Sequence, residues 1–271
     1  MRIACAARTD TGTVRAANQD NYLMLADRGV FIVADGMGGH AAGETASEMA
    51  VRIISREVGC PLGLSQVEVE GRVRAAIQAA NAAIYERARA DSDLRGMGTT
   101  TTVLVLMPGW YLIGQVGDSR AYRFRNGELV QLTRDHSFVL ELVEAGVLTV
   151  EQARVHPCRN VITRCLGSSC EVAPDIYLGS LEPGDILLLA SDGLTVMLED
   201  EHLIQILSTD LSPVHWVDRM VTEANRRGGW DNITAIAIRI ELLMSSRAGW
   251  ALEGSPRLVS ATSETGRREQ E

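Results

Sequence analysis

The sequence predicts an α+β fold in which an antiparallel sheet or sandwich is covered by helices. Short runs of β-forming residues occur in blocks, and tight turns join several of them, which favours antiparallel pairing. Two long helical patterns stand between the early strands and the middle strands, so helices and strands are grouped and do not alternate strictly. With 271 residues and 46% apolar composition, the chain can bury a sizeable core.

The expected strands are short runs of apolar and β-branched residues between turn signals. The clearest pair is a hairpin over residues 121–132, in which Asn126 and Gly127 favour a type I′ turn. The full set of expected strands covers residues 21–26, 30–34, 101–107, 111–116, 121–124, 129–132, 185–190 and 233–240.

Helices are expected from apolar periodicity and from capping residues. One covers residues 43–58, and a second covers about 67–90, where the apolar residues recur on one face. Ser212 followed by Pro213 predicts the start of a later helix, and the spacing after Thr149 predicts a capping box at the start of a short one.

Composition excludes several classes of protein. The net charge of −9 argues against a general nucleic-acid-binding surface, and all 26 basic residues are arginine, which excludes mechanisms that need a lysine. The five cysteines contain no C-x-x-C pair, which is typical of reduced thiols. No run reaches the ~18 apolar residues that a membrane span requires. We therefore expect a cytoplasmic monomer with no membrane or nucleic-acid partner.

Five aspartates lie at the ends of expected strands. Most have a glycine or an asparagine beside them, and the set consists of Asp20, Asp35, Asp118, Asp192 and Asp231. Asp-Gly is a common turn pair, but Asp35-Gly36 and Asp192-Gly193 lead toward helices and start no hairpin. If these strand ends meet at one edge, the carboxylates repel each other unless cations bind between them.

The ligand types in this set select hard cations. Clustered oxygen ligands favour Mg²⁺ or Mn²⁺, whereas the five histidines show none of the spacings typical of zinc sites. A glycine beside each aspartate lets backbone and water approach an ion, and a glycine carbonyl can itself be a ligand. Two such ions activate water for the hydrolysis of phosphate esters. Arg15, close to Asp20 in sequence, is a candidate to bind the phosphate.

Seven short motifs, in order, span most of residues 3–240. They are "TDTGTVRAANQD" (9–20), "ADGMGGHAAGE" (34–44), "GMGTT" (96–100), "GDSRAY" (117–122), "LTRDHS" (132–137), "SDGL" (191–194) and "WDNITAI" (230–236). This ordered set strongly resembles the metal-dependent protein phosphatases of type 2C, in their bacterial form.

The resemblance implies a central β-sandwich of two antiparallel sheets flanked by α-helices, a four-layer αββα arrangement with a flap next to the active site. It implies a catalytic domain over residues 1–241 with the flap at about 135–176, followed by a tail over 242–271, where the periodicity fades and which we expect to be disordered. The implied activity is hydrolysis of phosphoserine and phosphothreonine in proteins by a water or hydroxide held between two Mn²⁺ or Mg²⁺ ions.

Carried over by position, the resemblance also implies metal ligands. Asp35 would bridge the two ions, the carbonyl of Gly36 would complete the coordination of one ion, and Asp192 with Asp231 would hold the other. Asp118, together with Asp192, would form a third and weaker metal site.

Three further positions concern the substrate and the attacking water. Arg15 matches the arginine that binds the substrate phosphate, and Asp20 matches an acid that orients metal-bound water. The chain departs from eukaryotic relatives at Gln19, where they carry glutamate, and at Met37, where they carry a histidine that is proposed as the general acid. His40 could protonate the leaving oxygen, or it could hold the glycine turn together.

The leading hypothesis is a serine/threonine phosphatase that reverses a kinase of matching specificity and acts on phosphorylated proteins, including the kinase and its substrates. Two alternatives remain open from the sequence. The chain could be a non-catalytic module that binds phosphoproteins, or a phosphatase dedicated to a single regulatory partner.

Overall fold

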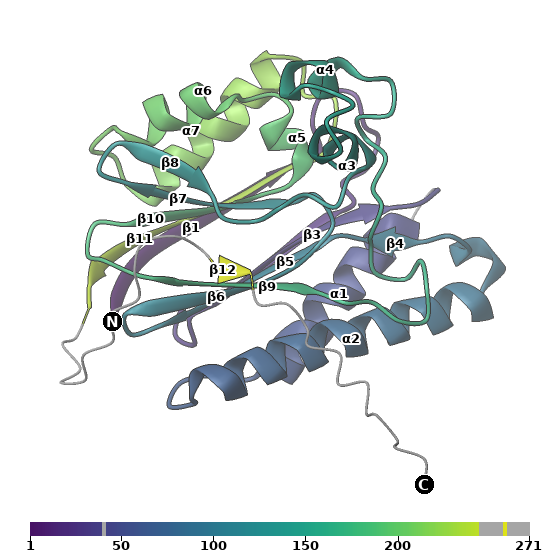
Figure 1. Cartoon of the computed structure of the whole chain (residues 1–271), viewed down its shortest axis with the longest axis horizontal. Helices are drawn as coiled ribbons and strands as arrows, with labels where there is room; N and C mark the ends of the chain where they lie inside the picture. Colours follow the sequence, from purple (N-terminus) through teal and green to yellow (C-terminus); the bar gives the residue numbers. More distant parts are fainter. Residues whose placement is uncertain (40–41, 244–256, 259–271) are drawn as a thin grey trace, which may run out of the picture.

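Two antiparallel sheets lie face to face in the computed structural model of the protein, which describes residues 1–39, 42–243 and 257–258 (Figure 1). The first sheet has the order β1-β11-β10-β7-β8, with strands Arg2–Asp10 (β1), Ile233–Leu242 (β11), Ile186–Ala190 (β10), Arg120–Arg125 (β7) and Glu128–Gln131 (β8). The second sheet has the order β12-β9-β6-β5-β3-β2, with strands Arg257–Leu258 (β12), Asp175–Ser180 (β9), Trp110–Val116 (β6), Thr101–Met107 (β5), Val30–Met37 (β3) and Asp20–Leu25 (β2). The short strand β4, Gly98–Thr99, pairs with β3.

Helices cover the outer face of each sheet (Figure 1). The long helices α1 (Ala42–Val58) and α2 (Gln66–Ala90) pack on the second sheet. The helices α5 (Asp192–Thr195), α6 (Asp200–Leu207) and α7 (Pro213–Arg226) pack on the first sheet. The resulting layers are helix, sheet, sheet and helix, which confirms the predicted four-layer αββα sandwich.

The strand that carries Asp35 shows why the central strands consist almost entirely of apolar residues. Val30, Ile32 and Ala34 belong to the core under α1 and α2. Phe31 and Val33 belong to the core between the two sheets. Because side chains alternate along a strand and both faces of β3 are buried, a continuous apolar run replaces the usual alternation of apolar and polar residues. This packing fixes the position of β3 up to Ala34, the residue before Asp35.

Local sequence signals place several elements as expected. Asn126 and Gly127 adopt φ values of 53° and 84° in the β7–β8 hairpin, as a type I′ turn requires. Thr149 forms the predicted capping box at the start of α4 (Val150–Val155). Ser212 occupies the N-cap position of α7, but its hydroxyl contacts Nδ1 of His215 at 2.8 Å and does not cap the helix.

Four of the described strands are absent from the sequence prediction, namely the short β4 and β12 and the longer β1 and β9. β1 has the sequence RIACAARTD, which is poor in β-branched residues, and it becomes a strand by pairing along its whole length with β11. β9 begins at Asp175, inside the segment predicted as flap, and it pairs with β6. In both cases the partner strand, not the local sequence, decides the conformation. The rest of the flap segment contains α3 (Phe138–Glu144) and α4.

The boundaries at the site and at the C-terminus also differ from the prediction. β3 extends through Asp35 to Met37, so Asp35 lies within a strand rather than after its end. β11 continues to Leu242, one residue past the boundary expected at 241. Residues 244–256 and 259–271, most of the tail expected to be disordered, lie outside the described residues, and Arg257–Leu258 pair with β9.

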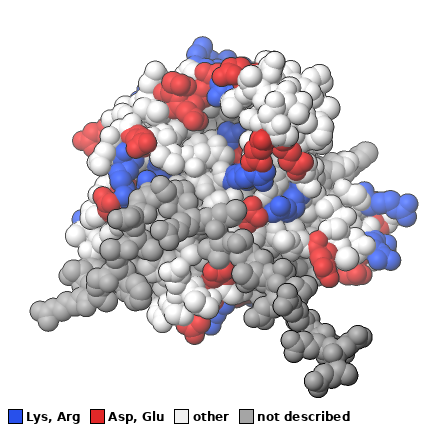
Figure 2. All heavy atoms as spheres, viewed as in Figure 1, with Lys and Arg blue, Asp and Glu red and all other residues white. Residues whose placement is uncertain are grey.

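The described part of the chain shows no helix with the length and apolarity that crossing a membrane requires. All five cysteines are free. On the face of the molecule drawn in Figure 2, acidic and basic side chains are interspersed and no large patch of one sign stands out.

Candidate active site

The predicted aspartates meet at one end of the sandwich. Asp20 and Asp35 lie directly opposite each other in the β2–β3 ladder. Asp192 is hydrogen-bonded to Asp35. The charge of Asp118 contributes to raising the pKa of Asp35, and the charge of Asp192 contributes to raising the pKa of Asp118. Asp231 acts electrostatically on Asp20 and Asp192. The structure therefore brings together all five residues that the sequence places at strand ends.

Asp20 joins the two sheets at this end of the molecule. It is the first residue of β2 and only 6% exposed. Its Oδ2 accepts hydrogen bonds from the hydroxyls of Ser191 at 2.7 Å and Thr234 at 2.6 Å. Ser191 directly follows β10 and Thr234 lies in β11, and both strands belong to the other sheet. Two donors on one oxygen fix the carboxyl group and leave its second oxygen, Oδ1, without a hydrogen-bond partner.

The backbone of Asp35 is held by two threonines. Its N–H donates to Oγ1 of Thr100 at 2.9 Å, and its carbonyl accepts from the N–H of Thr100 and the hydroxyl of Thr99, each at 2.9 Å. Both threonines are fully buried. The main chain at Asp35 is therefore fixed on both sides, which directs its side chain into the cluster.

Asp118 lies in a loop, whereas Asp192 begins a helix. Asp118 follows Gly117, whose φ of +105° is a conformation that disfavours other residues. Asp192 is the first residue of α5, directly after β10. Each has one buried carboxylate oxygen without a hydrogen-bond partner, as Asp20 does. Buried polar atoms are normally hydrogen-bonded, so three such oxygens in one cluster indicate groups that await a ligand.

Burial and mutual repulsion raise the pKa of Asp20, Asp35, Asp118 and Asp192. Burial is the main cause that raises the pKa of Asp20 to about 7, although the bonds from Thr234 and Ser191 lower it in part. Burial, followed by the charge of Asp192, raises the pKa of Asp118 to about 8. For Asp35 and Asp192 the pKa also rises, first through burial and then through neighbouring carboxylates. Cations between these groups would remove the repulsion.

The donor set fits magnesium or manganese. Every candidate side chain offers carboxylate oxygen, the ligand that these hard cations prefer. Within the described ranges, no group of three or more acidic, histidine or cysteine side chains is arranged so that it could by itself hold a metal ion. Mg²⁺ needs no such group, because it keeps several waters and is commonly held by only one or two carboxylates. The unpartnered oxygens of Asp20, Asp118 and Asp192 agree with such a water-rich site.

Arg15 and Asp231 form an exposed pair at the rim of the cluster. Nη2 of Arg15 lies 2.7 Å from Oδ2 of Asp231, and the two side chains are 54% and 31% exposed. Oδ1 of Asp231 accepts from the N–H of Asn232 at 2.8 Å. In contrast to the buried aspartates, both oxygens of Asp231 are engaged by protein donors.

Asn232 is a functional candidate that the sequence reasoning missed. Its side-chain amide donates to the carbonyls of Thr11 and Ala17, each at 2.9 Å, and its Oδ1 accepts from the N–H of Gln19 at 2.8 Å. These three bonds fasten the loop that carries Arg15 to the residues around Asp231. Its place inside the motif "WDNITAI" was the available signal. The sequence reasoning also missed Ser191 and Thr234, because their hydrogen-bond partner Asp20 is distant in sequence.

Gly36 is required for a reason other than the one expected. A Cβ atom at this position would lie 2.2 Å from the carbonyl oxygen of Gly43 and 2.5 Å from that of Gln19. Close packing of protein backbone therefore already demands glycine here. Met37, where eukaryotic relatives carry histidine, is partly buried, and His40 lies outside the described residues.

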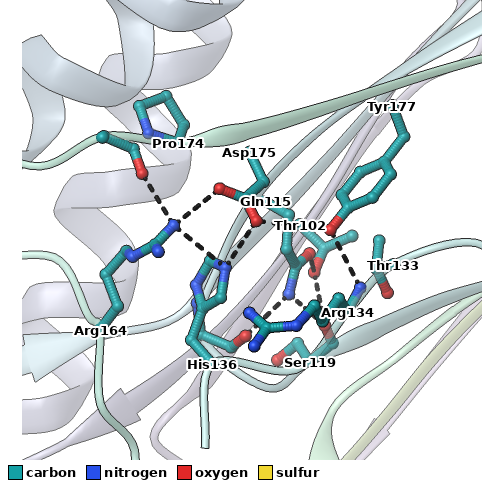
Figure 3. Close-up of polar contacts among 12 residues, drawn as sticks. Thr102, Gln115, Ser119, Thr133, Arg134, His136, Arg164, Pro174, Asp175 and Tyr177 are labelled. Atoms are coloured by element: carbon teal, nitrogen blue, oxygen red, sulfur yellow. Dashed lines mark hydrogen bonds and ion pairs between the residues drawn. The ribbon is translucent and has the colours of Figure 1, made fainter. Parts of the chain in front are cut away.

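A buried histidine connects the Asp118 loop to the flap (Figure 3). His136 is 2% exposed, and its ring nitrogen Nδ1 accepts a hydrogen bond from the backbone N–H of Gly117 at 3.0 Å. The backbone N–H of His136 donates to the carbonyl of Gly117 at 2.9 Å. Its ring proton is therefore on Nε2, which lies 3.1 Å from Oδ2 of Asp175. Arg164 lies 2.7 Å from Oδ1 of the same carboxylate. His136 thus links the backbone next to Asp118 to the start of β9.

Comparison with known proteins identifies the family. The model of the family described as protein phosphatase 2C matches residues 12–228. The serine/threonine phosphatase Stp of Listeria welshimeri is 40% identical over 246 residues, which are 89% of this chain and 97% of the relative. The protein phosphatase PhpP of Streptococcus pneumoniae is 40% identical over 237 residues, covering 85% of this chain and 94% of the relative.

Solved structures agree in fold. The serine/threonine phosphatase PstP/Ppp of Mycobacterium tuberculosis has a TM-score of 0.81 at 37% identity and covers 89% of this chain and 99% of its own. The catalytic domain of PstP in complex with two manganese ions has a TM-score of 0.80 at 35% identity and covers 88% of this chain and 98% of its own. The family, the fold and the dependence on Mn²⁺ or Mg²⁺ predicted from the sequence are confirmed. The chain belongs to the protein phosphatase 2C family.

Proposed function

We propose that this protein hydrolyses phosphoserine and phosphothreonine in other proteins, with Mn²⁺ or Mg²⁺ as cofactor. The observation that supports the proposal most directly is the set of buried carboxylates whose unpartnered oxygens meet at one end of the sandwich. A phosphoprotein-binding module without catalysis would gain nothing from carboxylates that repel each other and the anionic substrate.

The proposed metal ligands are those implied by the sequence. Asp35 and the carbonyl of Gly36 would hold one ion, and Asp35, Asp192 and Asp231 would hold another. Asp118 and Asp192 would help to hold a third ion. When bound, these ions would lower the pKa of a coordinated water and neutralise phosphoryl oxygens.

The remaining residues position the reacting groups. Asp20, fixed by the hydroxyls of Ser191 and Thr234, is placed to accept a hydrogen bond from the attacking water through its unpartnered Oδ1. Arg15 exchanges its bond to Asp231 for a two-pronged bond to the substrate phosphate, which neutralises the anion and frees an oxygen of Asp231. The role of His40 as proton donor to the leaving oxygen stays a prediction.

The finer assignments belong to the same proposal. We assign the catalytic domain to residues 1–241 and the flap to about 135–176. The substrates are phosphorylated proteins, and we propose that the enzyme reverses a serine/threonine kinase, acts as a monomer and works in the cytoplasm, where its five cysteines would stay reduced.

The test measures hydrolysis of p-nitrophenyl phosphate and of a phosphothreonine peptide with Mn²⁺, with Mg²⁺ and with excess chelator. We expect turnover with either metal, almost none with chelator, and recovery when Mn²⁺ is restored. Hydrolysis that persists in chelator would contradict the proposal. Binding of the peptide without turnover under any metal condition would favour the non-catalytic module.

A further inference from the structure

A cavity lies beside the carboxylate cluster. It encloses about 520 Å³ between the end of α2, the residues that follow the short helix η1 (Ser92–Leu94), β4 and residues 165–168 in the later part of the flap. Its lining residues are Met37, Tyr85, Ala88, Arg89, Arg95, Gly96, Met97, Gly98, Cys165, Gly167 and Ser168. None of the residues assigned to metal or phosphate lines it.

The strand β3 connects this cavity to the site. Met37 lines the cavity and lies two residues beyond Asp35 in the same strand, so both side chains point to the same side of β3. Gly98, also in the lining, pairs with Met37 across the β3–β4 ladder. At about 3.3 Å per residue, the cavity begins roughly 7 Å from Asp35. An extended peptide advances by a similar distance, so a side chain about two or three residues from the phosphorylated residue can reach it.

Arginine supplies the only charges in the lining of this cavity. Arg89 and Arg95 are both exposed, and neither forms an ion pair with any residue that the structure describes. Arg89 is oriented by Tyr85, because its guanidinium carbon lies 5.5 Å from the ring centroid and its Nη1 lies 3.5 Å from the hydroxyl. Both guanidinium groups therefore keep their charge available for an anionic group of a bound substrate.

A second groove, which is lined by Asp118 and Asp192 of the cluster, contains mostly acidic charges. It encloses about 450 Å³, and five acidic residues line it, namely Asp118, Asp135, Asp192, Glu199 and Asp200. It also contains three arginines, of which Arg120 pairs with Asp135 at 2.7 Å and Arg154 with Glu199 at 3.4 Å, while Arg159 has no ion pair with a described residue. The acidic residues outnumber the arginines there, so an acidic side chain of a substrate is favoured more by the first cavity, whose only charges are positive.

An ordinary structural role explains only part of this arrangement. Basic residues in the last turn of a helix stabilise its dipole, and Arg87 and Arg89 both stand in the last turn of α2. Arg87 pairs with Asp91 at 3.3 Å and lies outside the cavity lining. Arg95 lies beyond the helix, so the dipole does not account for its position.

We propose that Arg89 and Arg95 form a subsite for an acidic residue, or a second phosphorylated residue, about two or three positions from the phosphoserine or phosphothreonine. The subsite rests on the proposed function and specifies its substrate class, namely phosphoproteins with acidic flanking sequence. Arg95 and Arg89 are specificity residues in this arrangement and take no part in the hydrolysis itself.

The test compares kcat/KM for matched phosphothreonine peptides that carry glutamate or glutamine at each of about four positions on either side. For the wild-type protein with Mn²⁺ we expect a preference for glutamate of about tenfold at one position on one side, expressed in KM and weakened by salt. The double variant Arg89→Gln/Arg95→Gln should lose this preference. Arg95→Lys should keep most of it, because the charge remains.

Two controls separate the possible outcomes. Arg87→Gln removes a paired arginine from the same helical turn and should leave the preference unchanged, and all variants should hydrolyse p-nitrophenyl phosphate at the wild-type rate. If p-nitrophenyl phosphate is hydrolysed but glutamate gives no advantage, or the advantage survives in the double variant, the subsite is wrong and the proposed function stands. If the wild-type protein hydrolyses no phosphate ester with either metal, the proposed function fails and the subsite with it.

Discussion

The buried carboxylates and the exposed Arg15–Asp231 pair belong to one site but are held in different ways. Hydroxyl donors from the opposite sheet fix Asp20 and leave its Oδ1 without a partner, whereas Asp35 is held through its backbone, whose N–H donates to the hydroxyl of Thr100. Arg15 and Asp231 satisfy each other, and both side chains are open to solvent. The comparison teaches that one part of the site is built before any ligand arrives, whereas the other part must exchange partners when the ligand binds.

The largest expected effect comes from removing a charge in the buried part. We expect Asp35→Asn or Asp192→Asn to lower turnover of p-nitrophenyl phosphate with Mn²⁺ by about a thousandfold or more. In chelator, the same variants should melt at the wild-type temperature or above it, because one repelling carboxylate is gone. Turnover within about tenfold of wild type would mean that the buried cluster does not hold the metals.

A smaller effect is expected from loosening the donors of Asp20. Thr234→Val removes one of the two hydroxyl donors to its Oδ2, and we expect kcat to fall about tenfold with a loss of about 1–2 kcal/mol in unfolding free energy. Thr234→Ser keeps the hydroxyl and should restore most of kcat. If valine and serine variants behave alike, the hydrogen bond to Asp20 does not matter for turnover.

In the exposed part the effect should appear in binding. Arg15→Ala should raise KM for a phosphothreonine peptide by about tenfold with a smaller change in kcat, because a charged donor to the phosphate is lost. Arg15→Lys should recover only part of this, since lysine offers no two-pronged donor. Because Arg15 is exposed, the unfolding free energy should change by less than about 0.5 kcal/mol. An unchanged KM in Arg15→Ala would exclude the arginine from phosphate binding.

The smallest expected effect concerns the link between the flap and the Asp118 loop. Burial raises the pKa of Asp175, but the bonds from His136 and Arg164 outweigh it and lower the pKa to about 2. A carboxyl whose pKa is lower in the folded state stabilises the fold above its unfolded value of about 3.9, and this stability is lost as the pH falls toward the folded value.

Asp175→Asn should therefore cost about 1 kcal/mol at neutral pH, after allowance for screening by solvent, and the difference should fade between about pH 4 and pH 2. Urea unfolding at several pH values measures this, with Asp210→Asn at an exposed position as control. A difference that does not depend on pH would mean that the charge of Asp175 contributes nothing.

Much of the site could be predicted from the sequence. Aspartates after or before apolar runs, most of them near a turn-forming residue, predicted hard cations from residue chemistry on the condition that the strand ends meet at one edge. The residues that hold these aspartates could not be predicted, because a single buried Ser, Thr or Asn produces no periodic pattern in the sequence and its hydrogen-bond partners are far away in sequence. Thr234 and Asp20 are 214 residues apart, and Asn232 and Gln19 are 213 residues apart. The position of Arg89 and Arg95 at one cavity could not be predicted from the sequence either.

By itself, the sequence determined most strands and helices and the acidic set, because apolar periodicity and turn chemistry act over a few residues, and its ordered motifs implied the layers of the sandwich through their resemblance to a known family. Only the tertiary structure decided that RIACAARTD becomes the strand β1, that Asp35 stands inside a strand, and that Arg89 and Arg95 border one cavity. These features depend on which distant segments pair and pack. Pairing energy and burial arise between elements, and the local sequence of either partner does not contain them.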